Sequence, residues 1–215
     1  MFTGVIEHLG TISRLEVTSA GGKVTVHAPT LAQHLAVSVS VAVNGCCLTV
    51  VHREGNHFFA DLSVETLAKT SLGSLKNGAR VNLEQPLTAG KEFGGHFVLG
   101  HVDGTGRVAH LKAEGDGWIY GVEIPADLAR YVVSKGSLTI DGISLTVARW
   151  HNRIAEIAVI PYTYEHTNIR DRVAGDSVNL ETDILGKYIE RYAGQRTADK
   201  ISSSLTIDEL VRQGF

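Results

Sequence analysis

The chain has 215 residues, 43% of them hydrophobic and 20% charged, and a formal net charge of −3 at pH 7. This composition is that of an ordinary globular protein and excludes disorder over most of the chain. Lys and Arg are not in excess, so the chain lacks the positive charge that binding to a nucleic-acid backbone requires.

Features that would indicate a membrane or secreted protein are weak. The first four residues lack the basic and apolar regions of a secretory signal. Residues 24–52 contain no Asp, Glu, Lys or Arg, but Pro29 and an alternating pattern disfavour a membrane helix. Cys46 and Cys47 are adjacent, and Cα atoms about 3.8 Å apart are closer than the roughly 4.4 Å that a disulfide usually needs. We therefore expect a cytoplasmic protein without a structural disulfide.

The chain contains one sequence pattern twice. Residues 43–50 align with 140–147 at an offset of 97 and share Gly, Leu, Thr and Val, and residues 78–84 align with 175–181 at the same offset. Collinear matches at one spacing indicate an internal repeat. The predicted domains are a first repeat, a second repeat and a tail, at 1–88, 96–183 and 184–215.

Each repeat is predicted to be a small closed antiparallel barrel. Asn44-Gly45 and Asp141-Gly142 are hairpin-turn signals, each between two short apolar runs. Helical spacing follows Pro29 and Pro125, and proline suits a first helical turn. The predicted strands lie, in chain order, at 23–27, 41–44, 48–51, 118–124, 138–141 and 145–148.

The tail is predicted to begin with a helix. Ile184, Leu185, Tyr188, Ile189 and Tyr192 form one apolar stripe at helical spacing. A short helix of this kind needs a partner surface. Either a subunit contact or packing against the chain's own barrels would supply it. Farther on, residues 206–209 have capping-box spacing and predict a short last helix.

Two motifs have competing interpretations. Gly104-Thr-Gly106 fits a dinucleotide-binding pattern, but the residues after it alternate like a strand, where that motif needs a helix. His96 and His101 are five residues apart, yet no Cys, Asp or Glu cluster supports a metal site. A structural role and a role in a ligand site both remain open for the two histidines, and His101 lies beside glycines that let a ligand approach the backbone.

The strands after the two turns carry the clearest chemical signal. Side chains alternate across a strand, so Cys47 and Thr49 share one face, and Ser144 and Thr146 share the equivalent face. The opposite face, which contains Cys46, is apolar and core-like. Each repeat therefore presents a thiol or hydroxyl beside a threonine, which indicates two similar pockets.

These motifs together resemble the alpha chain of riboflavin synthase, and the resemblance spans essentially the whole chain. No single motif is specific, but the set in this order is. The segments that carry it are 1–7, 44–49, 95–103, 141–146 and 178–183.

The resemblance implies an all-β fold of two homologous six-stranded Greek-key barrels with short helices and a C-terminal helix that holds a homotrimer. It implies a transferase that converts two molecules of 6,7-dimethyl-8-ribityllumazine into riboflavin and 5-amino-6-(D-ribitylamino)uracil, the final step of riboflavin biosynthesis, without a metal or organic cofactor. The reacting pair is expected between the N-terminal barrel of one subunit and the C-terminal barrel of its neighbour. A surrounding capsid of lumazine synthase stays open, and the alternative is a non-enzymatic lumazine- or flavin-binding protein of the same fold.

The resemblance also assigns residues to the site. Those expected near the chemistry are Phe2, Ser40, Cys47, His101, Asp141, Ser144 and Thr146. Those expected to bind substrate in the N-terminal site are Gly4, Val5, Ile6, Cys47, Leu48, Thr49, Asp61, Leu62, Ser63, Val64, Glu65, Thr66, Gly100, His101 and Val102. Those expected in the C-terminal site are Lys135, Ser144, Leu145, Thr146, Ala158, Val159, Ile160, Pro161, Tyr162 and Thr163. Tyr162 departs from the family pattern, in which smaller or acidic residues are common there.

Overall fold

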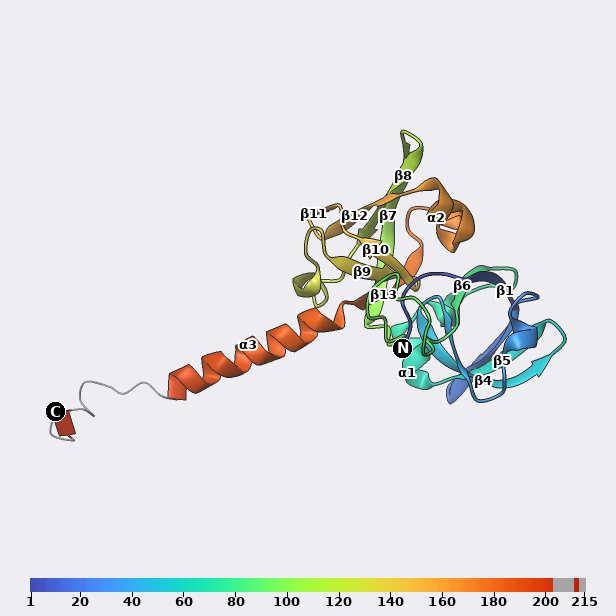
Figure 1. Cartoon of the computed structure of the whole chain (residues 1–215), viewed down its shortest axis with the longest axis horizontal. Helices are drawn as coiled ribbons and strands as arrows, with labels where there is room; N and C mark the ends of the chain where they lie inside the picture. The colour runs from blue at the N-terminus through green and yellow to red at the C-terminus, as the bar shows by residue number, and fades with distance from the viewer. Residues whose placement is uncertain (203–210, 213–215) are drawn as a thin grey trace. The chain divides into compact units, whose positions relative to one another are not determined.

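The computed structural model describes residues 1–202 and 211–212, with side chains described through residue 193 and at 211–212. In the first repeat the strands form a closed barrel in the order β1-β2-β5-β4-β3-β6, which is a Greek-key arrangement (Figure 1). The elements are β1 (His8–Thr18), β2 (Gly21–His27), η1 (Ala32–His34), β3 (Ser40–Val43), β4 (Cys46–Glu54), β5 (His57–Leu62), α1 (Val64–Lys69), η2 (Leu72–Ser74) and β6 (Arg80–Glu84).

The second repeat forms a curled seven-stranded sheet in the order β10-β9-β13-β7-β8-β12-β11. Its elements are β7 (Gly104–Glu114), β8 (Gly117–Glu123), η3 (Ala129–Tyr131), β9 (Ser137–Ile140), β10 (Ile143–Thr146), β11 (Arg149–His151), β12 (Ile154–Val159), α2 (Pro161–His166), η4 (Asn168–Asp171) and β13 (Ser177–Thr182). The prediction of an all-β chain built from two homologous barrels is confirmed.

The second barrel differs from the prediction in that it is not closed by a continuous strand ladder. The strand equivalent to β4 is divided at Val147 and Ala148 into β10 and β11. There the Val147 amide donates to the Gly136 carbonyl at 3.0 Å, and the Ala148 amide donates to the Glu156 carbonyl at 2.8 Å. The backbone groups are therefore satisfied across the break, and the chain itself joins the two edges of the sheet.

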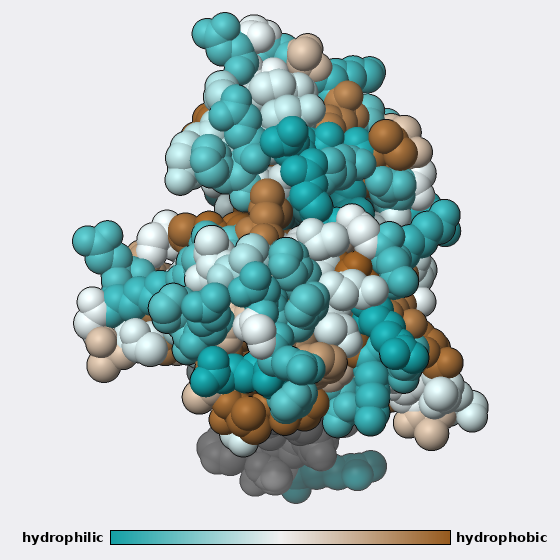
Figure 2. Space-filling view, turned by 90° about the vertical axis from the view of Figure 1, so that its right-hand side faces the viewer, coloured by the Kyte–Doolittle hydropathy of each residue, from teal (hydrophilic) through white to brown (hydrophobic). Residues whose placement is uncertain are grey.

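Each repeat has its own hydrophobic core. Val26, Val41 and Phe58 are among the fully buried residues of the first core, and Val122 and Ile157 are among those of the second. Burial alternates along the strands, as a sheet with one inward face requires. On the face shown in Figure 2, hydrophilic residues predominate and hydrophobic ones form separate patches.

The helical segments differ from those predicted. The segments after Pro29 and Pro125 form only the 3₁₀ turns η1 and η3. The helices α1 and α2 lie instead after β5 and β12, where the sequence reasoning placed none. Ser63 starts α1 because its hydroxyl accepts a hydrogen bond from the Thr66 amide at 3.0 Å. Proline occupies the first turn of α2.

The two hairpin turns meet back to back within residues 1–183. A Cβ on Gly45 would lie 2.7 Å from the Gly142 nitrogen, and a Cβ on Gly142 would lie 2.6 Å from the Gly45 nitrogen. Both glycines also have φ near +80°, at +76° and +81°. Only glycine permits this contact, which brings β4 and β10 close to each other.

Paired asparagines hold the halves together around these turns. The Asn82 side-chain amide donates to the Asp141 carbonyl at 2.9 Å, and the Asn179 amide donates to the Asn44 carbonyl at 2.8 Å. The side-chain oxygens accept hydrogen bonds from backbone amides of the other half. The Asn82 oxygen accepts from the Asn168 amide at 2.8 Å. The Asn179 oxygen accepts from the Ser71 amide at 2.7 Å. The repeated Val-Asn-Leu-Glu motif therefore builds an interface with internal two-fold symmetry.

The tail begins with α3 (Ile184–Ser202), which runs farther than the predicted apolar stripe. Leu185, Tyr188, Ile189 and Tyr192 are each more than half exposed in the single chain. The short helix predicted at 206–209 lies outside the described residues. Among the residues that are described, none belongs to a helix with the length and apolar character needed to cross a membrane.

One charged pair breaks the symmetry of the interface. The Arg172 guanidinium donates to the Asp141 carboxylate at 2.5 Å, and Asp141 is 1% exposed. In the first repeat the equivalent positions carry Asn44 and Leu75. A neutral amide and an apolar side chain thus replace an acid and its cation together, as expected where neither charge can be buried alone.

This exchange predicts the behaviour of three variants. Asp141→Asn leaves the Arg172 side chain, which is only 12% exposed, without its carboxylate and should lower the free energy of unfolding by about 3–5 kcal/mol. The double variant D141N/R172L copies the first repeat and should recover most of that loss. Denaturant unfolding of the parent, both single variants and the double variant measures the coupling. If the double variant lost as much free energy of unfolding as the two single variants added together, the coupling between Asp141 and Arg172 would be contradicted.

Candidate functional site

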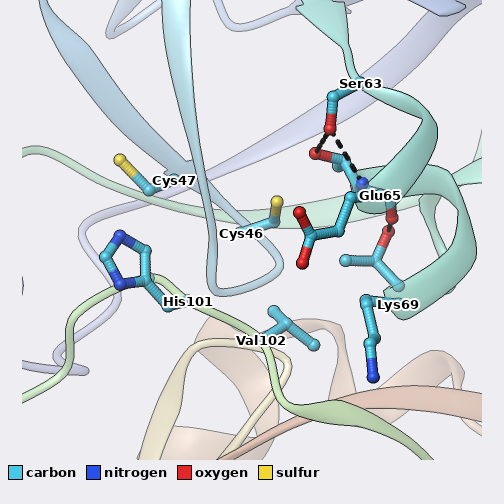
Figure 3. Close-up of a pocket in the computed structure, with 10 residues that line it drawn as sticks. Cys46, Cys47, Ser63, Glu65, Lys69, His101 and Val102 are labelled. Carbon is cyan, nitrogen blue, oxygen red and sulfur yellow. Dashed lines mark hydrogen bonds between the residues drawn. The ribbon is translucent and has the colours of Figure 1, made fainter. Parts of the chain in front are cut away.

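A cavity of about 250 Å³ lies on the outer face of the first barrel (Figure 3). Three segments far apart in the sequence form it: the start of β4, the helix α1 and the stretch that precedes β7. The lining residues are Cys46, Cys47, Ser63, Glu65, Thr66, Lys69, Thr70, Gly100, His101 and Val102.

The stretch at residues 100–102 comes from the second repeat but lies against the first. The Gly100 carbonyl accepts a hydrogen bond from the Cys47 amide at 2.8 Å. Gly100 has φ +78°, and a Cβ there would lie 2.7 Å from that of Cys47 and 2.9 Å from the Phe2 ring. The close approach therefore requires glycine and places His101 at the rim of the cavity. Figure 3 shows the thiol of Cys47 and the imidazole of His101 on the same side of this cavity.

The faces predicted for the strand after the turn are confirmed. Cys46 and Leu48 are buried, whereas Cys47 is half-buried and Thr49 is exposed. Burial raises the pKa of the Cys46 thiol to about 12. The equivalent strand β10 alternates in the same way, with Ser144 half-buried and Thr146 exposed.

The second repeat carries an equivalent but chemically different surface. The Gly4 carbonyl accepts a hydrogen bond from the Ser144 amide at 2.8 Å, as Gly100 does from Cys47. Val5 takes the place of His101. On α2, Tyr162 and His166 stack with ring centroids 4.1 Å apart, where α1 carries Glu65 and Lys69. The second surface is thus aromatic and apolar where the first is charged.

This arrangement changes one grouping that the resemblance implied. Gly4, Val5 and Ile6 were expected in the N-terminal site. Within one chain Gly4 instead contacts Ser144, and Ile6 packs against the core of the second barrel. The segment crosses because its backbone pairs with β10 rather than with β4.

His96, which the sequence prediction did not assign to the site, contacts two hydroxyl groups of the second repeat. Its Nδ1 lies 2.7 Å from the Ser144 hydroxyl oxygen, and its Nε2 lies 3.1 Å from that of Thr139. Burial lowers the pKa of His96, so the imidazole is neutral near pH 7. A neutral ring has one N–H and one lone pair, so it donates to one hydroxyl and accepts from the other. Gly95 was the available signal, because a Cβ there would lie 1.9 Å from the Thr3 carbonyl oxygen and 3.1 Å from the Ser144 Cβ.

Four further candidates fall into two groups. Ser40 is paired with Thr49 across β3 and β4, and Lys135 is exposed in the turn before β9. Phe2 and Asp141 are buried and do not line the cavity described above; Phe2 packs behind Cys47, and Asp141 belongs to the interface network. Within the described part of the chain, no group of three or more His, Cys, Asp and Glu residues could hold a metal ion.

Comparison with known proteins identifies the family. The lumazine binding domain model matches twice, at residues 3–86 and 99–183. The chain is 42% identical to riboflavin synthase of Actinobacillus pleuropneumoniae and 36% identical to riboflavin synthase of Bacillus subtilis (strain 168), over 100% of both chains in each case. The chain belongs to the riboflavin synthase family. The predicted resemblance is therefore confirmed.

Solved structures show the same fold with ligands. LumP complexed with riboflavin has a TM-score of 0.80 at 26% identity, and LumP complexed with 6,7-dimethyl-8-(1'-D-ribityl) lumazine has 0.78 at 25%. Both cover 85% of this chain and 99% of the other. The riboflavin synthase family and LumP thus share the architecture described here.

The two cysteines of this riboflavin synthase family member should differ in reactivity. A thiol reacts as the thiolate, so Cys46, with its raised pKa, should stay unmodified at pH 8 while Cys47 reacts. Mass spectrometry after brief alkylation of the folded protein counts the modified thiols. Cys47→Ser should abolish the labelling. Labelling of both thiols before unfolding would reverse the assignment of faces.

Proposed function

We propose that the chain is a riboflavin synthase, a transferase that moves a four-carbon unit between two molecules of 6,7-dimethyl-8-ribityllumazine. The acceptor becomes riboflavin and the donor leaves as 5-amino-6-(D-ribitylamino)uracil, so the atoms of two substrates equal those of two products. The repeat carries this proposal, because a reaction between two copies of one molecule suits two related pockets. The family membership supports it.

Alignment of the two molecules supplies much of the catalysis in this proposal. Holding two reactants in the correct geometry makes a bimolecular step effectively unimolecular and contributes up to roughly 7–11 kcal/mol. The two surfaces are similar in backbone but different in side chains. That difference suits identical molecules that must act in different roles, one as donor and one as acceptor.

The side chains then divide the chemistry between the pockets. In the first, the His101 imidazole is the group best suited to move a proton near neutral pH. Cys47 lies on the same side of the cavity (Figure 3). In the second, the hydroxyl of Ser144 is held by the neutral His96 ring at 2.7 Å. Such fixed donors stabilise charge that develops on a ring system.

The polyol chain of the substrate requires hydrogen-bonding partners. In the first pocket we assign these to α1, whose Ser63, Glu65, Thr66 and Lys69 line the cavity. In the second we assign them to α2 and the residues before it, from Ala158 to Thr163. There the exposed ring of Tyr162 offers an apolar face instead of a carboxylate.

The decisive experiment mixes the chain with the lumazine and records riboflavin by its absorbance. One riboflavin should form for every two lumazines consumed. His101→Gln should lower turnover by roughly 10- to 1000-fold, the scale of general acid–base catalysis. Lumazine affinity, measured by fluorescence titration without turnover, should change by less than about tenfold.

Other outcomes are distinct. Binding without riboflavin formation would favour the alternative of a non-enzymatic lumazine- or flavin-binding protein. If His101→Gln lowered affinity and melting temperature together but left turnover of the bound pair intact, His101 would only support its loop. Val5→Gln makes the corresponding change at the equivalent position of the second repeat and shows whether the effect is specific to the first pocket.

We further propose that the chain acts as a homotrimer with domains at 1–88, 96–183 and 184–215. The exposed stripe on α3 is the surface that a subunit contact would cover, and the matched family ranges support the two domain positions. We place the protein in the cytoplasm, because a reducing compartment keeps thiols such as Cys46 and Cys47 free. A lumazine synthase capsid is a further candidate partner.

The helix can be tested by single substitutions. Ile189→Lys places a charge on the stripe and should convert trimers to monomers, because a buried unpaired charge is costly. Lys187→Glu lies on the opposite helix face and should leave assembly unchanged. Analytical ultracentrifugation measures both. A stable trimer in Ile189→Lys would remove the role assigned to α3.

A further inference from the structure

Two buried glutamates occupy equivalent positions at the ends of β6 and β13. Glu84 is 1% exposed and Glu181 is 4% exposed. A buried carboxylate is unfavourable unless its oxygens accept hydrogen bonds. Neither residue lines the cavity of the first barrel.

Each carboxylate holds two consecutive backbone amides. Glu181 accepts from the Leu99 amide at 2.6 Å and from the Gly100 amide at 2.9 Å. Glu84 accepts from the Thr3 amide at 2.7 Å and from the Gly4 amide at 3.0 Å, and also from the Thr3 hydroxyl at 2.8 Å. We call each carboxylate with its two backbone amides a clamp. The same clamp therefore occurs once in each half.

The residues held by these carboxylates also contact the other half of the molecule. The carbonyl of Gly100 receives the Cys47 amide and that of Gly4 receives the Ser144 amide, each at 2.8 Å. Glu181, on the second barrel, thus fixes the segment that forms a wall of the first pocket. Glu84, on the first barrel, fixes the segment that lies over Ser144.

We propose that Glu181 is a positioning residue for Cys47 and His101, and that Glu84 is the equivalent positioning residue for Ser144. Each acts through backbone amides and touches no substrate. The proposal rests on the proposed function for its catalytic consequence, but not for its geometry. A carboxylate is required because an amide side chain would direct an N–H group at one of the two backbone N–H donors.

Thiol labelling tests the geometry without any substrate. Loss of the Glu181 clamp should free the segment over Cys47, and a hydrogen bond to a charged group, at about 1.5–3 kcal/mol, corresponds to a labelling rate roughly 10- to 100-fold higher. Glu181→Gln should therefore accelerate Cys47 labelling by at least tenfold. Glu84→Gln is the matched control and should change it by less than about twofold. Cys46 should stay unlabelled in both, which separates local loosening from unfolding of the barrel.

Kinetics then test the catalytic consequence. Both Gln variants should lower kcat for riboflavin formation by tenfold or more. Glu181→Asp and Glu84→Asp, which keep the charge on a shorter side chain, should recover part of it. The Asp variants also carry the labelling test if a Gln variant fails to fold.

The outcomes separate the two proposals. Accelerated Cys47 labelling in Glu181→Gln alone would support the clamp even if the parent made no riboflavin. Equal acceleration in both variants, labelling of Cys46 alongside Cys47, or an unchanged Cys47 rate in folded Glu181 variants would each overturn it. Full kcat in Glu181→Gln with the segment loosened would overturn its role in positioning Cys47 and His101 for catalysis.

Discussion

The contact between the two hairpin turns is the constraint on which the rest of residues 1–183 depends. Gly45 and Gly142 meet so closely that neither position has room for a side chain. This contact fixes the two barrels relative to each other and sets β4 and β10 near the interface. The asparagine pairs around the turns then donate hydrogen bonds to the Asp141 and Asn44 carbonyls beside this contact.

A consequence of this geometry is that neither of the two equivalent surfaces is built from one repeat alone. Gly4 and Ile6 precede the first barrel but lie against the second, and the stretch around Gly100 precedes the second barrel but lies against the first. The antiparallel bridge between Phe2 and Val98 joins these two segments at the centre. A destabilising change in the core of one barrel should therefore alter the pocket of the other, because backbone hydrogen bonds connect them.

The sequence could predict the features that depend on local pattern. Alternation along the strands after the two turns gave the correct faces for Cys46 and Cys47, and the repeat gave two related barrels. The short helices were harder to predict, because α1 depends on one cap at Ser63 and the burial of Leu128 and Val132 needs only a 3₁₀ turn. The crossing of Gly4 to Ser144 was beyond local reasoning, since it is set by contacts between residues far apart in the chain.

The differences between the repeats distinguish positions that contacts within the protein constrain from positions that are free to differ in their chemistry. At the interface, Asn44 and Leu75 become Asp141 and Arg172, and the two changes make sense only together, because each buried charge needs the other. At the pocket rim, Val5 and His101 differ without any such compensation. Their exposure removes the need for a partner within the chain. Divergence without compensation is therefore concentrated where a bound molecule, rather than the protein itself, would meet the side chain.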